Sequence, residues 1–170
     1  SGRQLHELDI VRETRDALAE SGVDPSAVVL EITESVLMQQ EGSVLTRLTD
    51  LKALGVQLAI DDFGTGYSSL SYLRRFPIDM IKIARPFVED IGGGLDKSAL
   101  ARAIIGLGET LKLRTVAEGV ERTEQCLALM SLGCELGQGY YFAPPLSADD
   151  VRAMLEQPRS LLPAPVMGAL

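Results

Sequence analysis

Short hydrophobic runs alternate with amphipathic stretches along most of the chain. Runs rich in β-branched and aliphatic residues predict buried strands at residues 28–33, 56–62, 79–83, 114–119 and 134–142. Apolar residues at helical spacing, with capping residues before them and glycines after them, predict helices at residues 5–19, 41–54, 68–76, 98–111, 121–132 and 148–156. Helix and strand therefore alternate from one end of the sequence almost to the other.

This alternation predicts a parallel sheet covered by helices, an α/β fold. No Gly-x-Gly-x-x-Gly follows a strand, so a dinucleotide-binding site has no support. A TIM-like (β/α) barrel fits the alternation, but the chain has only 170 residues, whereas such barrels need ~250. We therefore expect an incomplete barrel, with about five of eight strands, in residues 1–157. A Pro-rich apolar tail follows at residues 158–170.

Composition narrows the possible functions. A formal charge of −8 argues against binding to a nucleic acid polymer, which requires a basic face. With His6 as its one histidine, the chain has no basis for a histidine zinc site or a Ser-His-Asp triad. No apolar run has the length of a membrane span, and Cys126 and Cys134 form no disulfide framework. A cytoplasmic protein with reduced, buried cysteines is expected.

The central motif is the stretch A-I-D-D-F-G-T-G-Y-S-S-L at residues 59–70. An apolar strand delivers two adjacent carboxylates, Asp61 and Asp62, to a loop with glycines at 64 and 66. Two carboxylates at the end of a buried strand are costly to desolvate unless a positive charge pairs with them, and a divalent cation suits oxygen ligands. Taken alone, the pair could equally cap the following helix.

Polar side chains on the other strands favour the cation. Each expected strand contains a polar residue among apolar neighbours or ends in one: Glu31, Asp61 with Asp62, Lys82, Glu118 and Gln138. In barrels the active site forms at the carboxyl ends of the strands. Four carboxylates and one lysine match a site for one or two Mg²⁺ or Mn²⁺ ions and a phosphate. The alternative is a set of satisfied polar groups in the barrel core.

The same residues resemble a known family. The segments L-E-I-T-E-S (30–35), D-D-F-G-T-G-Y-S-S-L (61–70), I-D-M-I-K-I (78–83), T-V-A-E-G-V-E (115–121) and G-C-E-L-G-Q-G-Y-Y-F-A-P-P (133–145) look like the EAL domain, the bacterial cyclic di-GMP phosphodiesterase family. The resemblance implies a TIM-like barrel that hydrolyses cyclic di-GMP to linear pGpG in second-messenger signalling. It also implies a homodimer and a sensor or GGDEF-type domain upstream.

The resemblance assigns a role to each site residue. Glu31, Asp61 and Glu118 would bind one metal ion, and Asp62 the second. Lys82 would orient the attacking water or contact the phosphate, and Gln138 would help hold water at the metals, so Lys82, Glu118 and Gln138 are the expected catalytic residues. A flexible loop, anchored by Glu34, would consist of Phe63, Gly64, Thr65, Gly66, Tyr67 and Ser68.

Three departures from the family pattern leave a second function open. The E-A-L signature with its glutamate is absent, an asparagine expected before Ser1 is absent, and Ala84 replaces an aspartate that usually follows Lys-Ile. The chain thus looks like an EAL domain without its first two or so strands. It could be a phosphodiesterase domain, or an inactive module that binds cyclic di-GMP or a protein partner.

Overall fold

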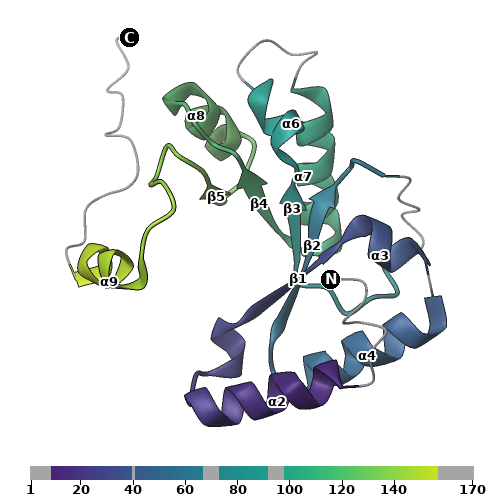
Figure 1. Ribbon diagram of the computed structural model, residues 1–170. Helices are drawn as coiled ribbons and strands as arrows, with labels where there is room; N and C mark the ends of the chain where they lie inside the picture. The colour runs from purple at the N-terminus through teal and green to yellow at the C-terminus, as the bar shows by residue number, and fades with distance from the viewer. Residues whose placement is uncertain (1–8, 40, 67–72, 92–97, 157–170) are drawn as a thin grey trace.

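We describe a computed structural model that covers residues 9–39, 41–66, 73–91 and 98–156 (Figure 1). The strands are β1 (Val29–Thr33), β2 (Gln57–Phe63), β3 (Met80–Ile83), β4 (Arg114–Glu118) and β5 (Leu136–Gln138). The helices are α2 (Ile10–Ser21), α3 (Glu34–Gln39), α4 (Glu41–Ala53), α6 (Arg85–Glu89), α7 (Ala99–Leu111), α8 (Thr123–Ser131) and α9 (Ala148–Glu156), with a 3-10 turn, η1 (Pro25–Ala27). No described helix is long and apolar enough to cross a membrane.

The strand order confirms the predicted α/β barrel type. All the strands are parallel, and their order in the sheet is β1-β2-β3-β4-β5, the order of the sequence. In a doubly wound sheet the order of the strands reverses at one point, whereas in a barrel each strand pairs with the strand that precedes it in the sequence. Within the described residues the sheet is open, because β1 and β5 do not pair with each other.

Several predicted boundaries need correction. β5 ends at Gln138 instead of residue 142, because the chain turns at Gly139, whose carbonyl accepts from the backbone N–H of Phe142 at 3.0 Å. Phe63, expected in the loop, is the last residue of β2 and is buried. α3 and α6 were not predicted, since segments of six and five residues are too short to show helical periodicity. The expected helix at 68–76 and the tail at 158–170 lie largely or wholly outside the described residues.

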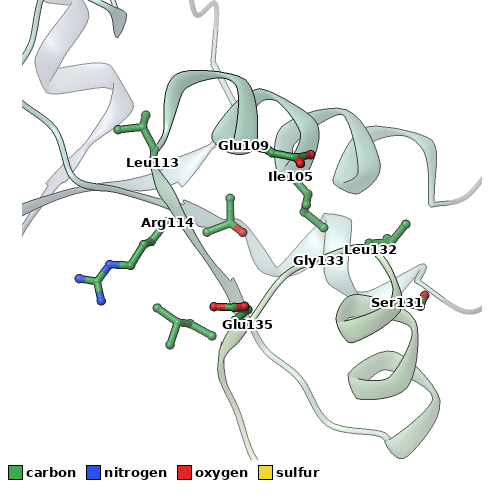
Figure 2. Close-up of a pocket in the computed structure, with 10 residues that line it drawn as sticks. Ile105, Glu109, Leu113, Arg114, Ser131, Leu132, Gly133 and Glu135 are labelled. Atoms are coloured by element: carbon green, nitrogen blue, oxygen red, sulfur yellow. The ribbon is translucent and has the colours of Figure 1, made fainter.

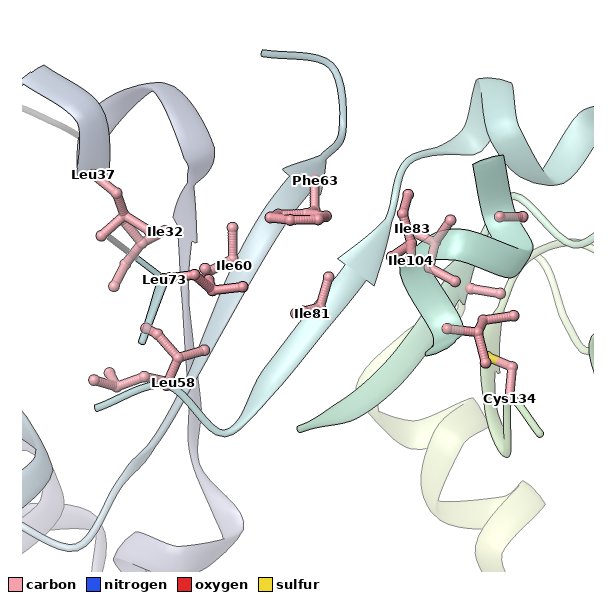
Figure 3. Close-up of a cluster of buried hydrophobic side chains, with 14 of the residues drawn as sticks. Ile32, Leu37, Leu58, Ile60, Phe63, Leu73, Ile81, Ile83, Ile104 and Cys134 are labelled. Carbon is pink, nitrogen blue, oxygen red and sulfur yellow. The ribbon is translucent and has the colours of Figure 1, made fainter. Parts of the chain in front are cut away.

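The hydrophobic core lies between the sheet and its helices (Figure 3). Leu58, Ile60, Ile81 and Ile83 alternate along β2 and β3 and are at most 1% exposed. Each such side chain stabilises the fold by about 1.5–3 kcal/mol when fully buried. Helix residues that share this core include Leu37, Val44, Leu48, Val88, Ile104 and Leu129. Both cysteines are free thiols in this core, as predicted.

Alternation along the strands places the polar residues on the opposite face. Successive side chains of a strand point to opposite faces of the sheet. Glu31 alternates with Ile32, Lys82 with Ile81 and Ile83, and Glu118 with Ala117, and these apolar neighbours all belong to the core. The face turned away from the helices therefore receives the charged side chains, which is the interior face of a barrel.

Two glycines in α7 give a matched test of how this helix packs on β4. A Cβ atom at Gly106 would meet no described atom within 4 Å, whereas one at Gly108 would lie 2.5 Å from Thr115 Cγ2 and 3.2 Å from the Leu113 carbonyl oxygen. Gly106→Ala is expected to raise the free energy of unfolding by about 0.5–1 kcal/mol, and Gly108→Ala to lower it by about 1–3 kcal/mol. Urea unfolding of both variants checks this. Equal gains in stability would contradict the close contact.

Candidate functional site

The predicted site residues come together at one end of the sheet. Register pairs Glu118 of β4 with Gln138 of β5, and Lys82 of β3 with Val116. Glu31 on β1 and Asp61 on β2 lie on the same face by the alternation described above. Tyr67 and Ser68, expected in the loop, lie outside the described residues. Parallel strands thus bring together side chains that are far apart in the sequence.

Lys82 is the centre of this cluster. Its ammonium Nζ lies 2.7 Å from Glu31 Oε2, 3.0 Å from Asp61 Oδ1 and 2.6 Å from Glu118 Oε1. The Lys82 side chain is 8% exposed, whereas those of Glu31, Asp61 and Glu118 are 46%, 26% and 19% exposed. One buried cation is therefore shared by three carboxylates from three different strands, and the local charge is negative.

The carboxylates keep Lys82 protonated. Burial alone would lower the pKa of Lys82, but hydrogen bonds to Glu118, Glu31 and Asp61 outweigh it and raise this pKa above its ordinary value of 10.5. At pH values below the pKa of Lys82 in the unfolded chain, the ion pairs contribute their full free energy to stability. This contribution is lost only as the pH rises through the higher pKa that Lys82 has in the folded chain. At neutral pH, Lys82 is a fixed positive charge and does not act as a base.

A bulge in β2 turns both aspartates to the same side. In a regular strand Asp61 and Asp62 would point to opposite faces. The pairing of β2 with β3 shifts register between Ile60 and Phe63, and Asp62 has a φ of 55°. As a result, carboxylate oxygens of Asp61, Asp62 and Glu118 lie within 4.8 Å of one another.

This cluster fits a divalent cation. Its donors are all carboxylate oxygens, the ligands that Mg²⁺, Mn²⁺ and Ca²⁺ prefer. Asp61 Oδ1 is buried and faces the Lys82 ammonium at 3.0 Å. This one ammonium is shared with Glu31 and Glu118, so the carboxylates keep a net negative charge that favours a further cation. A cation bound between Asp61, Asp62 and Glu118 would offset that charge.

Glu34 connects the start of α3 to the loop after β2. Its side chain is 3% exposed, and Glu34 Oε2 accepts from the backbone N–H of Gly64 at 2.8 Å. A Cβ at Gly66 would lie 2.7 Å from Glu34 Oε1, so glycine at this position allows the carboxylate to approach. These contacts hold the loop at Gly64 and Gly66 against the start of α3.

Some features of the site were not anticipated from the sequence. The amide side chain of Gln138 is exposed, and Glu118 is its register partner. Arg85 at the start of α6 forms an ion pair with Glu121 at 2.9 Å, next to the end of β4. Thr65 Oγ1 donates to the carbonyl oxygen of Asp62 at 2.8 Å. Only the glycines of the loop signalled that the backbone there turns sharply.

A cavity of about 570 Å³ lies away from this cluster (Figure 2). It opens between α7 and α8, and its lining includes Glu109, Arg114 and Glu135. Arg114 begins β4, whereas Glu118 ends it. The cavity and the carboxylates are thus at opposite ends of the same strand. The chemistry of the donors, and not the size of the hollow, locates the candidate site.

Comparisons with known proteins show which proteins this chain is similar to. The family model described as the EAL domain matches residues 1–145. The bifunctional diguanylate cyclase/cyclic di-GMP phosphodiesterase MucR of Pseudomonas aeruginosa is 42% identical over 153 residues, which are 90% of this chain and 22% of MucR. This chain spans between 18% and 22% of the length of the first curated relatives it matches.

Several solved structures are also similar to this chain. The MucR phosphodiesterase in complex with cyclic di-GMP has a TM-score of 0.84 at 42% identity, with 89% of this chain and 61% of that chain covered. The EAL domain of Mycobacterium smegmatis DcpA has a TM-score of 0.86 at 39% identity, covering 91% and 70%. A manganese and cyclic di-GMP complex of Klebsiella pneumoniae BlrP1 has a TM-score of 0.77 at 38% identity, covering 84% and 36%. The chain therefore belongs to the EAL domain family.

Proposed function

We propose that these residues form part of a phosphodiesterase domain that hydrolyses cyclic di-GMP to linear pGpG in bacterial second-messenger signalling. The observation that carries this proposal is the convergence of Asp61, Asp62 and Glu118 within 4.8 Å at the carboxyl ends of their strands. The names of MucR, a cyclic di-GMP phosphodiesterase, and of its cyclic di-GMP complex support the substrate.

Glu31, Asp61, Asp62 and Glu118 would hold the metal ions of this site. A divalent cation bound there supplies an activated water and neutralises charge on a phosphodiester. Manganese and calcium complexes of BlrP1 support an oxygen-ligated divalent cation, and we propose Mg²⁺ or Mn²⁺ for this chain.

The remaining side chains orient the substrate and water. Lys82 keeps its proton and holds Glu31 and Glu118 in place, and its positive charge would orient the attacking water or attract a phosphate oxygen. Gln138, at the end of the strand beside Glu118, offers an exposed amide that can hold water by hydrogen bonds. Glu34 would anchor the loop from Phe63 to Ser68 through Gly64.

The partners follow from the same proposal. The ligand is cyclic di-GMP, and the protein acts as a homodimer in the cytoplasm, with a sensor or GGDEF-type domain upstream. The bifunctional name of MucR, which joins a diguanylate cyclase to a phosphodiesterase, supports an upstream domain.

The test is turnover of cyclic di-GMP by this chain with Mg²⁺ or Mn²⁺, with the linear product followed by chromatography. Glu31→Ala is expected to reduce turnover at least about a hundredfold, since metal ligands act as a unit. Glu20→Ala on the exposed face of α2 is the matched control and is expected to leave the rate unchanged.

The results of this assay distinguish a phosphodiesterase from an inactive module that binds cyclic di-GMP. Turnover that survives Glu31→Ala would reject this site as its source. Absence of turnover, with cyclic di-GMP binding measured by calorimetry, would favour an inactive module that binds the nucleotide. Glu31, at 46% exposed, is the most solvated of the three carboxylates that pair with Lys82. A metal ligand this open to solvent favours the inactive binding module as the second candidate function.

A further inference from the structure

Asp62 has an unusual backbone conformation for a residue with a side chain. Within the described residues only Asp62, at φ 55°, and Lys112, at φ 58°, have a positive φ without being glycine. Aspartate tolerates the left-handed region better than most residues, but the conformation still costs about 1 kcal/mol. The bulge that brings Asp62 beside Asp61 depends on it. Some contact must therefore hold Asp62 in this conformation.

Thr65 provides that contact through two hydrogen bonds to the same atom. The carbonyl oxygen of Asp62 accepts from the Thr65 backbone N–H at 3.3 Å and from the Thr65 hydroxyl at 2.8 Å. The first distance is long for an N–H donor, whereas the second is ordinary for a hydroxyl. Gly64, at φ 93°, occupies the third position of this turn, as a type II turn requires. The hydroxyl is thus the closer restraint on Asp62.

We propose that Thr65 is a positioning residue for the cation site. Its hydroxyl holds the Asp62 carbonyl, which fixes the left-handed backbone and keeps the second carboxylate beside Asp61 and Glu118. Thr65 acts through Asp62 and does not itself ligate the cation. This inference rests on the proposed function, because it concerns the same divalent-cation site.

The exposure of Thr65 makes the inference testable without damage to the core. Its side chain faces solvent, so valine preserves the branched shape and removes only the hydroxyl. Serine preserves the hydroxyl and removes only the methyl group. If the hydroxyl is what matters, serine will behave like threonine and valine will not.

The experiment measures Mn²⁺ binding to the metal-free chain by isothermal titration calorimetry. Thr65→Val is expected to weaken binding about tenfold or more, as loss of a residue that orients a ligand typically does, and Thr65→Ser to stay within about threefold. Without metal, the unfolding midpoints of both variants are expected within about 2 °C of the parent chain. Binding is measured directly, so the result does not depend on turnover.

Distinct outcomes overturn the inference and the function on which it rests. Absence of Mn²⁺ binding by the parent chain would overturn the proposed cation site. Normal binding by Thr65→Val, or equally weak binding by Thr65→Ser, would overturn only the role of the hydroxyl. The unfolding midpoint of Thr65→Val could also fall far enough to explain its weaker Mn²⁺ binding. That result would overturn the positioning role of the hydroxyl, because the hydroxyl would then act on folding.

Discussion

Replacement of Asp61 by asparagine is expected to lower the turnover of cyclic di-GMP by about a thousandfold or more. Asparagine keeps the size of the side chain but loses the charge. Asp61 belongs to the oxygen cluster with Asp62 and Glu118, and its Oδ1 also lies 3.0 Å from Lys82 Nζ. A neutral amide at this position would both weaken the cation site and place N–H donors where an acceptor is needed. Turnover and Mn²⁺ affinity are measured on the same sample.

The fold is expected to survive this change. Lys82 keeps its ion pairs with Glu31 and Glu118 when Asp61 becomes neutral. Asp50→Asn provides the control, since Asp50 is an exposed carboxylate on α4, and it should leave both turnover and Mn²⁺ affinity unchanged. Turnover near that of the parent chain in Asp61→Asn would contradict the assignment of Asp61 as a metal ligand.

The sequence predicted those parts of the site that depend on strand periodicity. Glu31, Lys82 and Glu118 each lie among apolar residues in a short run, so a parallel sheet with these side chains at one end followed from the pattern alone. The family resemblance rested on the same segments, and the EAL family match confirms it. The sequence therefore predicted both which segments form strands and that the site lies at the carboxyl ends of these strands.

Features that depend on pairing between strands were not predictable. The bulge at Asp61–Asp62 arises from the register of β2 against β3, which no local pattern encodes. The same register decides that Lys82 reaches three carboxylates at once, which the sequence did not indicate. Phe63 is buried for this reason too, because the bulge extends β2 past the aspartates into the core.

Replacement of Lys82 by methionine is expected to cause the largest change in stability. Methionine fills a similar volume but leaves Glu31, Asp61 and Glu118 without their shared cation. Removal of one partner from a buried ion pair typically costs 3–5 kcal/mol, and partial exposure of these carboxylates reduces the expected loss to about 2–4 kcal/mol. The free energy of unfolding of metal-free Lys82→Met, measured in urea, gives this loss.

Divalent cations are expected to reverse part of that loss. A cation that binds the folded state stabilises it in proportion to the logarithm of its concentration over its Kd. In Lys82→Met, Mn²⁺ is the available positive charge for the carboxylates, so millimolar Mn²⁺ should raise the free energy of unfolding more in this variant than in the parent chain. The difference between the two gains isolates the electrostatic role of the lysine.

Lys52→Met is the matched control for this prediction. Lys52 Nζ pairs with Asp79 Oδ2 at 2.6 Å, near the amino ends of the strands, and both side chains are partly exposed. Its loss is expected to cost about 1 kcal/mol, independently of Mn²⁺. A Lys82→Met protein as stable as the parent chain, or one that gains no more from Mn²⁺ than Lys52→Met, would contradict the view that Lys82 balances the charge of a cation site.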